Sequence, residues 1–100
     1  MPKLEIRRSE AFDRWLKSLR DEIARTRIEY RIYRFSQGNP GDVKSVGEGV
    51  FELRIDHGPG YGVYFMRQNW VVVLLLIGGD KRTQRKDIAA AIAMARERRG

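Results

Sequence analysis

The stretch that decides the fold runs from Val50 to Lys81 and reads VFELRIDHGPGYGVYFMRQNWVVVLLLIGGDK. Apolar and polar residues alternate over positions 50–55 and again over 61–65, with the turn-forming sequence HGPG between them. An uninterrupted apolar run follows from Trp70 to Ile77. Alternation is typical of strands with one buried face, and a continuous apolar run is typical of a strand buried on both. The stretch therefore predicts three consecutive antiparallel strands, the third lying centrally and ending at the Gly78-Gly79-Asp80 sequence.

Helical patterns flank this stretch on both sides. Ser9 and Asp21 are good N-cap residues for two successive helices, which we expect to form a hairpin packed on one side of the sheet. Thr83 offers an N-cap for a last helix, which is expected to run as far as about Arg96. The apolar residues at helical spacing are Phe12, Trp15, Leu16 and Leu19 in the first helix, Ala24, Ile28, Ile32 and Phe35 in the second, and Ile88, Ala91, Ile92 and Ala95 in the last.

Two shorter alternating segments complete the pattern. Residues 4–6 and 43–46 each have the composition of a short strand, and the turn formers at 37–42 end the second helix. The sequence thus predicts an α+β fold in a single domain spanning residues 1–100. Its elements are a short N-terminal strand, a two-helix hairpin, an antiparallel sheet of about four further strands and a C-terminal helix.

The charge balance is the strongest global signal of function. The chain has 20 lysines and arginines against 13 acidic residues, a net charge of +7, which favours a phosphate backbone or an acidic protein as partner. No apolar run approaches the roughly 18 residues of a membrane span, and the N-terminus lacks the apolar stretch of a secretory signal. Cysteine is absent, as is usual in a reducing compartment. We expect a cytoplasmic protein that makes no contact with a membrane.

Few catalytic patterns are present. The single histidine, His57, has only Asp56 beside it, so we expect neither a metal site nor a cofactor. Strand periodicity places Glu52 and Arg54 on the face opposite the core, with position 62 beside Tyr64. Such a cationic and aromatic face is suited to metal-free cleavage of RNA, in which the 2′-hydroxyl attacks its own phosphate. The candidate residues are Lys44, Arg54, Tyr61, Tyr64, Lys81, Arg82 and Arg85.

In this chemistry each residue type has a role. A lysine whose pKa is lowered by neighbouring cations serves as the base, arginine stabilises the phosphorane charge, and tyrosine stacks on a splayed base. The second predicted helix also carries arginines beside Tyr30 and Tyr33. Two interpretations of that helix stay open, a phosphate-contacting flank and a solvated helix face.

Four spaced motifs resemble a known family. They are FDRWLKSLRDEIARTRI (12–28), GNPGDVKSVGEGVFELRI (38–55), GPGYGVYF (58–65) and IGGDKRTQRKDI (77–88). Together they resemble the phage-derived addiction-module killer proteins, a HigB-like branch of the RelE/ParE toxin superfamily. The resemblance implies a RelE-like fold and a toxin neutralised by a cognate antitoxin, commonly of helix-turn-helix type, with which it forms a complex. It also implies cleavage of messenger RNA on the ribosome without a metal.

The resemblance suggests a set of site residues. Lys44, Arg54 and Lys81 match basic positions of the family, and we expect them to be catalytic, with Tyr61, Tyr64, Arg82 and Arg85 binding RNA. Position 62 departs from the pattern, because such proteins usually have arginine where this chain has glycine. We interpret Gly62 as the loss of a functional arginine, by natural decay or deliberate change, that attenuates activity. The alternative is a bulge or a close backbone approach that requires glycine.

Three functions follow from these observations. The leading hypothesis is a ribosome-dependent messenger RNA endoribonuclease of the toxin type. The second is a toxin that binds DNA gyrase through the helical hairpin, since fold resemblance alone does not separate the two targets. The third is a non-catalytic basic module that binds nucleic acid or an acidic antitoxin, with steep salt dependence and no turnover.

Overall fold

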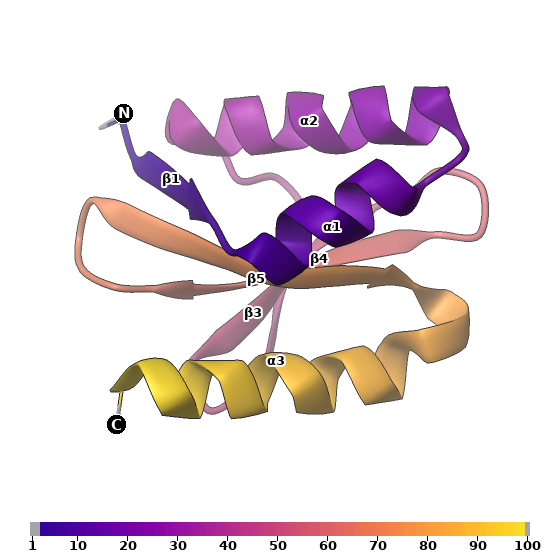
Figure 1. The fold of residues 1–100 in the computed structure, drawn as a ribbon. Helices are drawn as coiled ribbons and strands as arrows, with labels where there is room; N and C mark the ends of the chain where they lie inside the picture. The colour runs from indigo at the N-terminus through magenta and orange to yellow at the C-terminus, as the bar shows by residue number, and fades with distance from the viewer. Residues whose placement is uncertain (1–2, 100) are drawn as a thin grey trace.

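The computed structural model describes residues 3–99, in which one sheet lies between two layers of helices (Figure 1). Helices α1 and α2 cover one face, and α3 covers the other (Figure 1). The elements in chain order are β1 (Glu5–Arg8), α1 (Glu10–Ser18), α2 (Glu22–Ser36), β2 (Val43–Gly47), β3 (Val50–Ile55), β4 (Tyr61–Arg67), β5 (Val72–Asp80), the 3-10 turn η1 (Lys81–Thr83) and α3 (Gln84–Arg99). The predicted α+β class and element order are confirmed.

The strand order across the sheet is β1-β5-β4-β3-β2. Strands β2 to β5 form an antiparallel series, as the alternation predicted. The N-terminal strand β1 pairs in parallel with β5, so the sheet is mixed. The side chains of β5 enter the cores on both faces of the sheet, which explains its continuous apolar run, although β4 occupies the middle of the sheet.

The two N-caps predicted for the helical hairpin are confirmed. The Ser9 hydroxyl accepts a hydrogen bond from the Phe12 backbone N–H at 3.0 Å and donates to the Leu76 carbonyl at 2.6 Å. The Asp21 carboxylate accepts from the Ala24 backbone N–H at 3.1 Å. These contacts satisfy N–H groups that the first turn of a helix leaves without an intrahelical partner. Ser9 additionally ties the start of α1 to β5.

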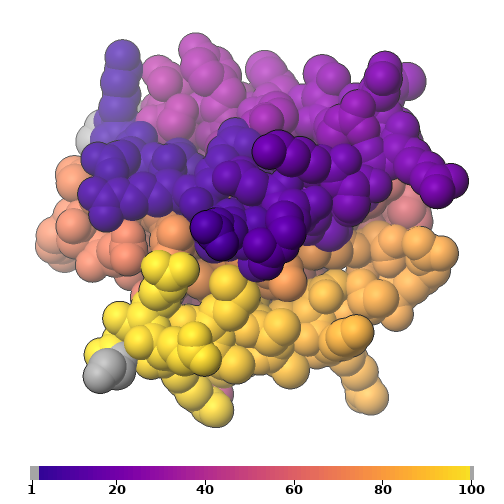
Figure 2. All heavy atoms as spheres, in the orientation of Figure 1, coloured from indigo at the N-terminus to yellow at the C-terminus, as the bar shows by residue number. Residues whose placement is uncertain are grey.

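The apolar side chains form two cores, one on each face of the sheet. Phe12, Ile28 and Phe35 of α1 and α2 pack on one face with Leu53, Val63 and Leu75. Ala91 and Ala95 of α3 pack on the other face with Val50, Tyr64 and Leu76. The expectation of an uncovered cationic face is therefore wrong over most of its length. Figure 2 shows the two helical layers from the same side as Figure 1, with purple atoms of α1 and α2 above and yellow atoms of α3 below.

Strand β5 differs from the sequence prediction at both ends. It begins at Val72, and Trp70 lies before it with 93% of its surface exposed. It continues through Gly78 and Gly79, which were expected to end it. These glycines give room to other side chains, since the Trp15 ring lies against Gly78 on one face and the Asp87 carboxylate against Gly79 on the other. Glycine is therefore required by packing at these positions.

The entry into α3 also differs from the prediction. Asp80, rather than Thr83, caps the turn η1 by accepting a hydrogen bond from the Arg82 backbone N–H at 2.8 Å. The Thr83 hydroxyl instead donates to the Asp87 carboxylate at 2.6 Å. Within residues 3–99, no helix has the length and apolar character needed to span a bilayer.

Candidate functional site

A pocket of about 370 Å³ opens at the end of the sheet where α3 begins. Five residues predicted from the sequence line it, and they come from four separate segments: Lys44, Arg54, Tyr61, Gly62 and Lys81. The other lining residues are Asp42, Glu52, Ile55, Asp56, Gly60, Asp80 and Gln84. The fold thus brings together the side chains that were expected to act jointly.

Strand register explains why the pocket forms here. Arg54 of β3 pairs with Gly62 of β4, and Gly62 pairs with Gly79 of β5. Directly paired residues place their side chains on the same face of a sheet. This row therefore carries one long cationic side chain followed by two positions without a side chain. The Glu52 carboxylate occupies the space at Gly62 and the Asp87 carboxylate the space at Gly79, so the pocket lies beside Arg54 with Glu52 as part of its lining.

Lys44 and Lys81 reach the pocket from opposite sides. Lys44 lies on β2, directly opposite Glu52 of β3 in the register. Lys81 follows β5, and its backbone N–H donates to the Gly60 carbonyl at 3.2 Å. The Lys81 side chain lies along Gly60, where an added Cβ would come within 3.3 Å of the lysine Cε. Both lysines are exposed, so their ammonium groups are accessible to a ligand.

The pocket carries mixed charge, whereas the sequence analysis predicted a cationic surface. Four acidic residues, Asp42, Glu52, Asp56 and Asp80, line it together with the three cations. Arg54 forms an ion pair with Asp42 at 3.1 Å, and this hydrogen bond raises the pKa of the Arg54 guanidinium. A phosphate entering the pocket therefore competes with Asp42 for Arg54.

Glu52 is a site residue that the sequence analysis did not propose. It is only 4% exposed, and its Oε2 accepts hydrogen bonds from the Tyr64 hydroxyl and the Gln84 side-chain amide, each at 3.1 Å. The sequence contained a signal for Glu52, because residues two apart in a strand point to the same face and Glu52 therefore lies on the face of Arg54. A buried carboxylate with hydrogen-bond donors is able to take part in proton transfer.

Tyr64 does not have the predicted role of stacking on an RNA base. It is 1% exposed and belongs to the core beneath α3. Burial, followed by the neighbouring Glu52 carboxylate, raises the pKa of the Tyr64 hydroxyl well above its usual value. Tyr64 therefore remains a neutral hydrogen-bond donor to Glu52. Tyr61 does line the pocket, with its ring edge-on to Trp15 at a centroid distance of 6.3 Å.

The structure places the two remaining predicted RNA-binding residues, Arg82 and Arg85, beside the pocket rather than in its lining. Arg82 is bound to Asp80 at 2.8 Å, and the hydrogen bond from Arg82 holds the pKa of the Asp80 carboxyl below its usual range. Arg85 is exposed in the first turn of α3. Both can contact a ligand that extends beyond the pocket.

Arg31 of α2 is a second residue that the sequence analysis missed. Its guanidinium donates to the backbone carbonyls of Arg54, Pro40 and Asp42, the last two at 3.0 and 3.4 Å. Partial burial lowers the pKa of Arg31. Arg31 thus fixes the backbone on both sides of the Asp42–Arg54 ion pair. No sequence pattern indicated this contact, which depends on how α2 lies over the sheet.

The comparisons with known proteins give one relationship across nearly the whole chain. The chain is 51% identical over 94 residues to an uncharacterized protein of Haemophilus influenzae, an alignment that covers 94% of this chain and 95% of that protein. The chain belongs to the same family as this Haemophilus protein. No protein-family model matches the chain.

In this family member, the single histidine lies at the edge of the site. His57 Nε2 is 3.1 Å from Asp21 Oδ2, a contact that joins the β3–β4 turn to the start of α2. Over the described range 3–99, there is no group of three or more histidines and acidic residues arranged to hold a metal ion. The groups available for chemistry in the pocket are three cations, four carboxylates, one phenol and one amide.

Proposed function

We propose that this protein is a toxin of the RelE/ParE type that cleaves messenger RNA at the ribosome without a metal ion. The observation that carries the proposal is the convergence of Lys44, Arg54 and Lys81 on one pocket, since these residues come from three different segments. The net charge of +7 supports an RNA substrate, because it attracts a phosphate backbone.

The proposed reaction is attack of a ribose 2′-hydroxyl oxygen on the adjacent phosphorus. The P–O5′ bond breaks, a 2′,3′-cyclic phosphate forms, and the 5′ oxygen leaves as a hydroxyl. Glu52 accepts the 2′-hydroxyl proton, and a protonated lysine, Lys44 or Lys81, donates a proton to the 5′ oxygen. Arg54 and the second lysine stabilise the negative charge on the phosphorane oxygens. Tyr61 contacts a base or sugar beside the scissile phosphate.

Gly62 has two competing explanations. One is the lost family arginine, which would leave the protein with attenuated activity. The other is packing, because an added Cβ at position 62 would come within 3.1 Å of Glu52 Cγ and Cδ and closer still to Oε2. The Gly62→Arg variant decides between them. Stronger cleavage than wild type supports attenuation, and a destabilised protein without extra cleavage supports packing.

We further propose a cytoplasmic location and a cognate antitoxin of helix-turn-helix type that forms a complex with the toxin and covers the pocket. A basic protein of this size favours acidic partners, and the lysines at the pocket mouth are accessible. Co-expression of the neighbouring reading frame tests this part, with rescue from growth arrest as the readout.

The function itself is tested by controlled expression, with growth and transcript 5′ ends measured together. The purified protein is then added to programmed ribosomes. We expect growth arrest and cleavage within translated messages, both lost in Lys44→Ala/Arg54→Ala. Arg96→Ala is the matched control. Arg96 lies in the last turn of α3, forms an ion pair with Glu48 and does not line the pocket.

Three outcomes reject the proposal. Growth arrest with intact transcripts excludes the nuclease. Inhibition of DNA supercoiling that survives Arg54→Ala and Lys81→Ala but is lost on changing α1 and α2 indicates a gyrase poison. Salt-sensitive RNA binding without turnover, in wild type and in Gly62→Arg, indicates a non-catalytic binding module.

A further inference from the structure

A second hollow lies beside the candidate site, along the exposed face of α2. This α2 groove has a volume of about 790 Å³ and is lined by Glu22, Ile23, Thr26, Arg27, Tyr30, Arg31, Arg34, Ile55 and Asp56. Ile55 and Asp56, at the end of β3, also line the pocket that holds Lys44 and Arg54. The two hollows are therefore neighbours that meet at the C-terminal end of β3.

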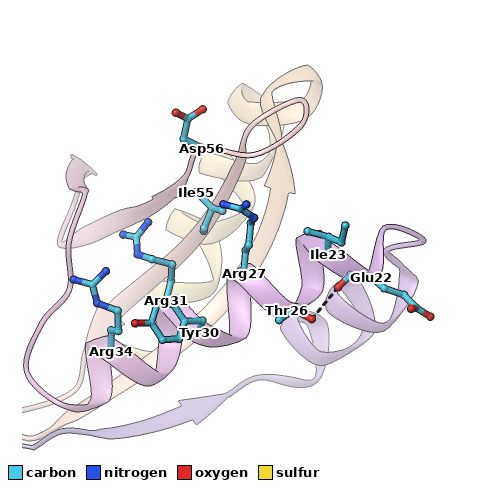
Figure 3. A pocket seen from close by; sticks show the side chains of 9 residues that line it. All are labelled: Glu22, Ile23, Thr26, Arg27, Tyr30, Arg31, Arg34, Ile55 and Asp56. Atoms are coloured by element: carbon cyan, nitrogen blue, oxygen red, sulfur yellow. Dashed lines mark hydrogen bonds between the residues drawn. The ribbon is translucent and has the colours of Figure 1, made fainter.

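Helical spacing gathers cations and an aromatic ring on the wall of the groove. Arg27, Tyr30, Arg31 and Arg34 stand at i, i+3, i+4 and i+7, so they occupy one face of α2. Figure 3 shows the three guanidinium groups projecting from α2 on the side that faces Ile55 and Asp56. Seven residues of helix rise about 10 Å, the length of about three stacked nucleotides.

The groups in the groove differ in how far they are already engaged. The Arg31 guanidinium donates hydrogen bonds to three backbone carbonyls, so it adds positive charge to the groove but is not free to turn toward a ligand. Across residues 3–99, the guanidinium groups of Arg27 and Arg34 have no hydrogen-bond or ion-pair partner, and that of Arg34 lies 5.8 Å from the centroid of the Tyr30 ring. Tyr30 itself is 58% exposed. Two cations without a hydrogen-bond partner among the described residues and one exposed ring thus lie together on this face of α2.

We infer that the α2 groove binds the single-stranded RNA that flanks the scissile phosphate, with Arg27 and Arg34 on backbone phosphates and Tyr30 stacked on a base. The inference rests on the proposed function and extends it to the path of the substrate. Exposed arginines beside an aromatic face are the usual platform for single strands, because every base has a π-face. Asp56 lies between the two hollows, so the strand passes it with a base or sugar rather than a phosphate.

The experiment measures binding of 2′-O-methyl RNA, which lacks the attacking hydroxyl and is not cleaved. Two fluorescent single strands are compared by anisotropy, one of about three nucleotides and one of about twelve, within the range of single-strand sites. The short strand fills only the pocket, and the long strand reaches the groove. Purified full-length protein is titrated over a range of salt concentrations.

The variants are chosen with matched controls. Arg27→Gln/Arg34→Gln removes two groove cations, and Arg14→Gln/Arg98→Gln removes two exposed cations on α1 and α3. Tyr30→Leu removes the groove ring, and Tyr33→Leu removes a ring of similar exposure, 60%, on the same helix but outside the groove. All four substituted side chains of the groove and control pairs are exposed or half-buried, so folding is preserved.

For the long strand, affinity falls as salt rises. We expect Arg27→Gln/Arg34→Gln to make the slope of log affinity against log salt less steep by about 1.4, or about 0.7 per lost phosphate contact. Tyr30→Leu should weaken binding roughly fivefold or more, the effect of losing one stacked base. The short strand and both control proteins should behave as wild type.

The possible failures are distinguishable. Unchanged long-strand binding in the groove variants, together with normal cleavage at ribosomes, rejects the groove and leaves the proposed function standing. Absence of RNA binding and of cleavage in wild type rejects both. Groove variants that bind RNA normally but lose binding to a polyglutamate peptide overturn the inference in favour of an acidic protein partner.

Discussion

Gly62 lies directly against the carboxylate of Glu52, and no residue with a Cβ fits at position 62 unless that carboxylate moves. The contact supports the packing explanation for a glycine in the middle strand of the sheet, where the missing side chain is otherwise unfavourable. In this position the Glu52 carboxylate accepts hydrogen bonds from the Tyr64 hydroxyl and the Gln84 side-chain amide. The candidate site thus depends on an absent side chain as much as on the charged ones.

This contact predicts coupling between positions 62 and 52. Gly62→Ala should lower the free energy of unfolding by about 1–3 kcal/mol, because it overpacks a buried position. In a Glu52→Ala background, the same change should cost little, since the carboxylate no longer occupies the space. Urea denaturation of wild type, Gly62→Ala, Glu52→Ala and the double variant measures the coupling free energy between the two positions. Additive effects would show that the two residues do not compete for space.

The three pocket cations should affect catalysis more than stability. Lys44→Ala, Arg54→Ala and Lys81→Ala should each reduce RNA cleavage about a hundredfold, the usual effect of losing one group that stabilises developing charge. Their free energies of unfolding should change by less than about 1 kcal/mol, because the side chains are exposed and the Arg54–Asp42 pair is at the surface. Cleavage at ribosomes and denaturant titration are measured on the same preparations, with Arg96→Ala as control. An equal loss of RNA cleavage in the three pocket variants and in Arg96→Ala would exclude a specific role for the pocket.

Tyr64 should limit stability in alkali. Burial raises the pKa of its hydroxyl above the ordinary value of 10, so the folded protein keeps a proton that the unfolded chain releases. The stabilising contribution is complete below pH 10 and is lost as the pH rises above it. Absorbance titration of phenolate should show Tyr64 ionising only as circular dichroism reports unfolding, and Tyr64→Phe should flatten the alkaline decline. Ionisation of all four tyrosines near pH 10 in a folded protein would contradict the burial of Tyr64.

Asp21 should contribute to stability at neutral pH and lose this contribution in acid. The Ala24 backbone N–H, followed by His57, holds the pKa of the Asp21 carboxyl below its ordinary 3.8. A lowered folded-state pKa stabilises the protein above that ordinary value, and the effect disappears as the pH falls through the folded pKa. Asp21→Asn keeps a capping side chain but removes the charge. Its unfolding free energy should be lower than wild type at pH 6 and should converge with it in strong acid, whereas a constant difference would exclude the charge as the cause.

Local patterns predicted most of the fold. Ser9 and Asp21 marked the helix starts because N-capping is a contact between residues two or three apart. The period of two in residues 50–55 placed Leu53 in the core and Arg54 outside it. The predictions failed where a distant segment decides, as at Gly78, whose space is filled by Trp15 of α1. Such contacts leave no periodic signal in either segment.

The site shows the same division. Strand parity and the family resemblance indicated Lys44, Arg54 and Lys81, and the fold places all three around one pocket. Tyr64 has the same parity as Glu52 and is buried with it, because α3 covers that part of the sheet. The alternation of side chains along a strand shows which face a residue occupies, but it does not show which part of that face a helix will cover.

By itself, the sequence determined the class of fold, the order of its elements, the excess of positive charge and the cations that face away from the first core. Only the tertiary structure decided that α3 covers most of the second face, that the Glu52 and Asp87 carboxylates fill the space at Gly62 and Gly79, and that Glu52 lines the pocket beside Arg54. The physical reason is the distance along the chain between the residues that interact. Hydrogen-bonding and hydrophobic periodicity are local properties of the chain, whereas the space left beside a glycine depends on residues far away in the sequence.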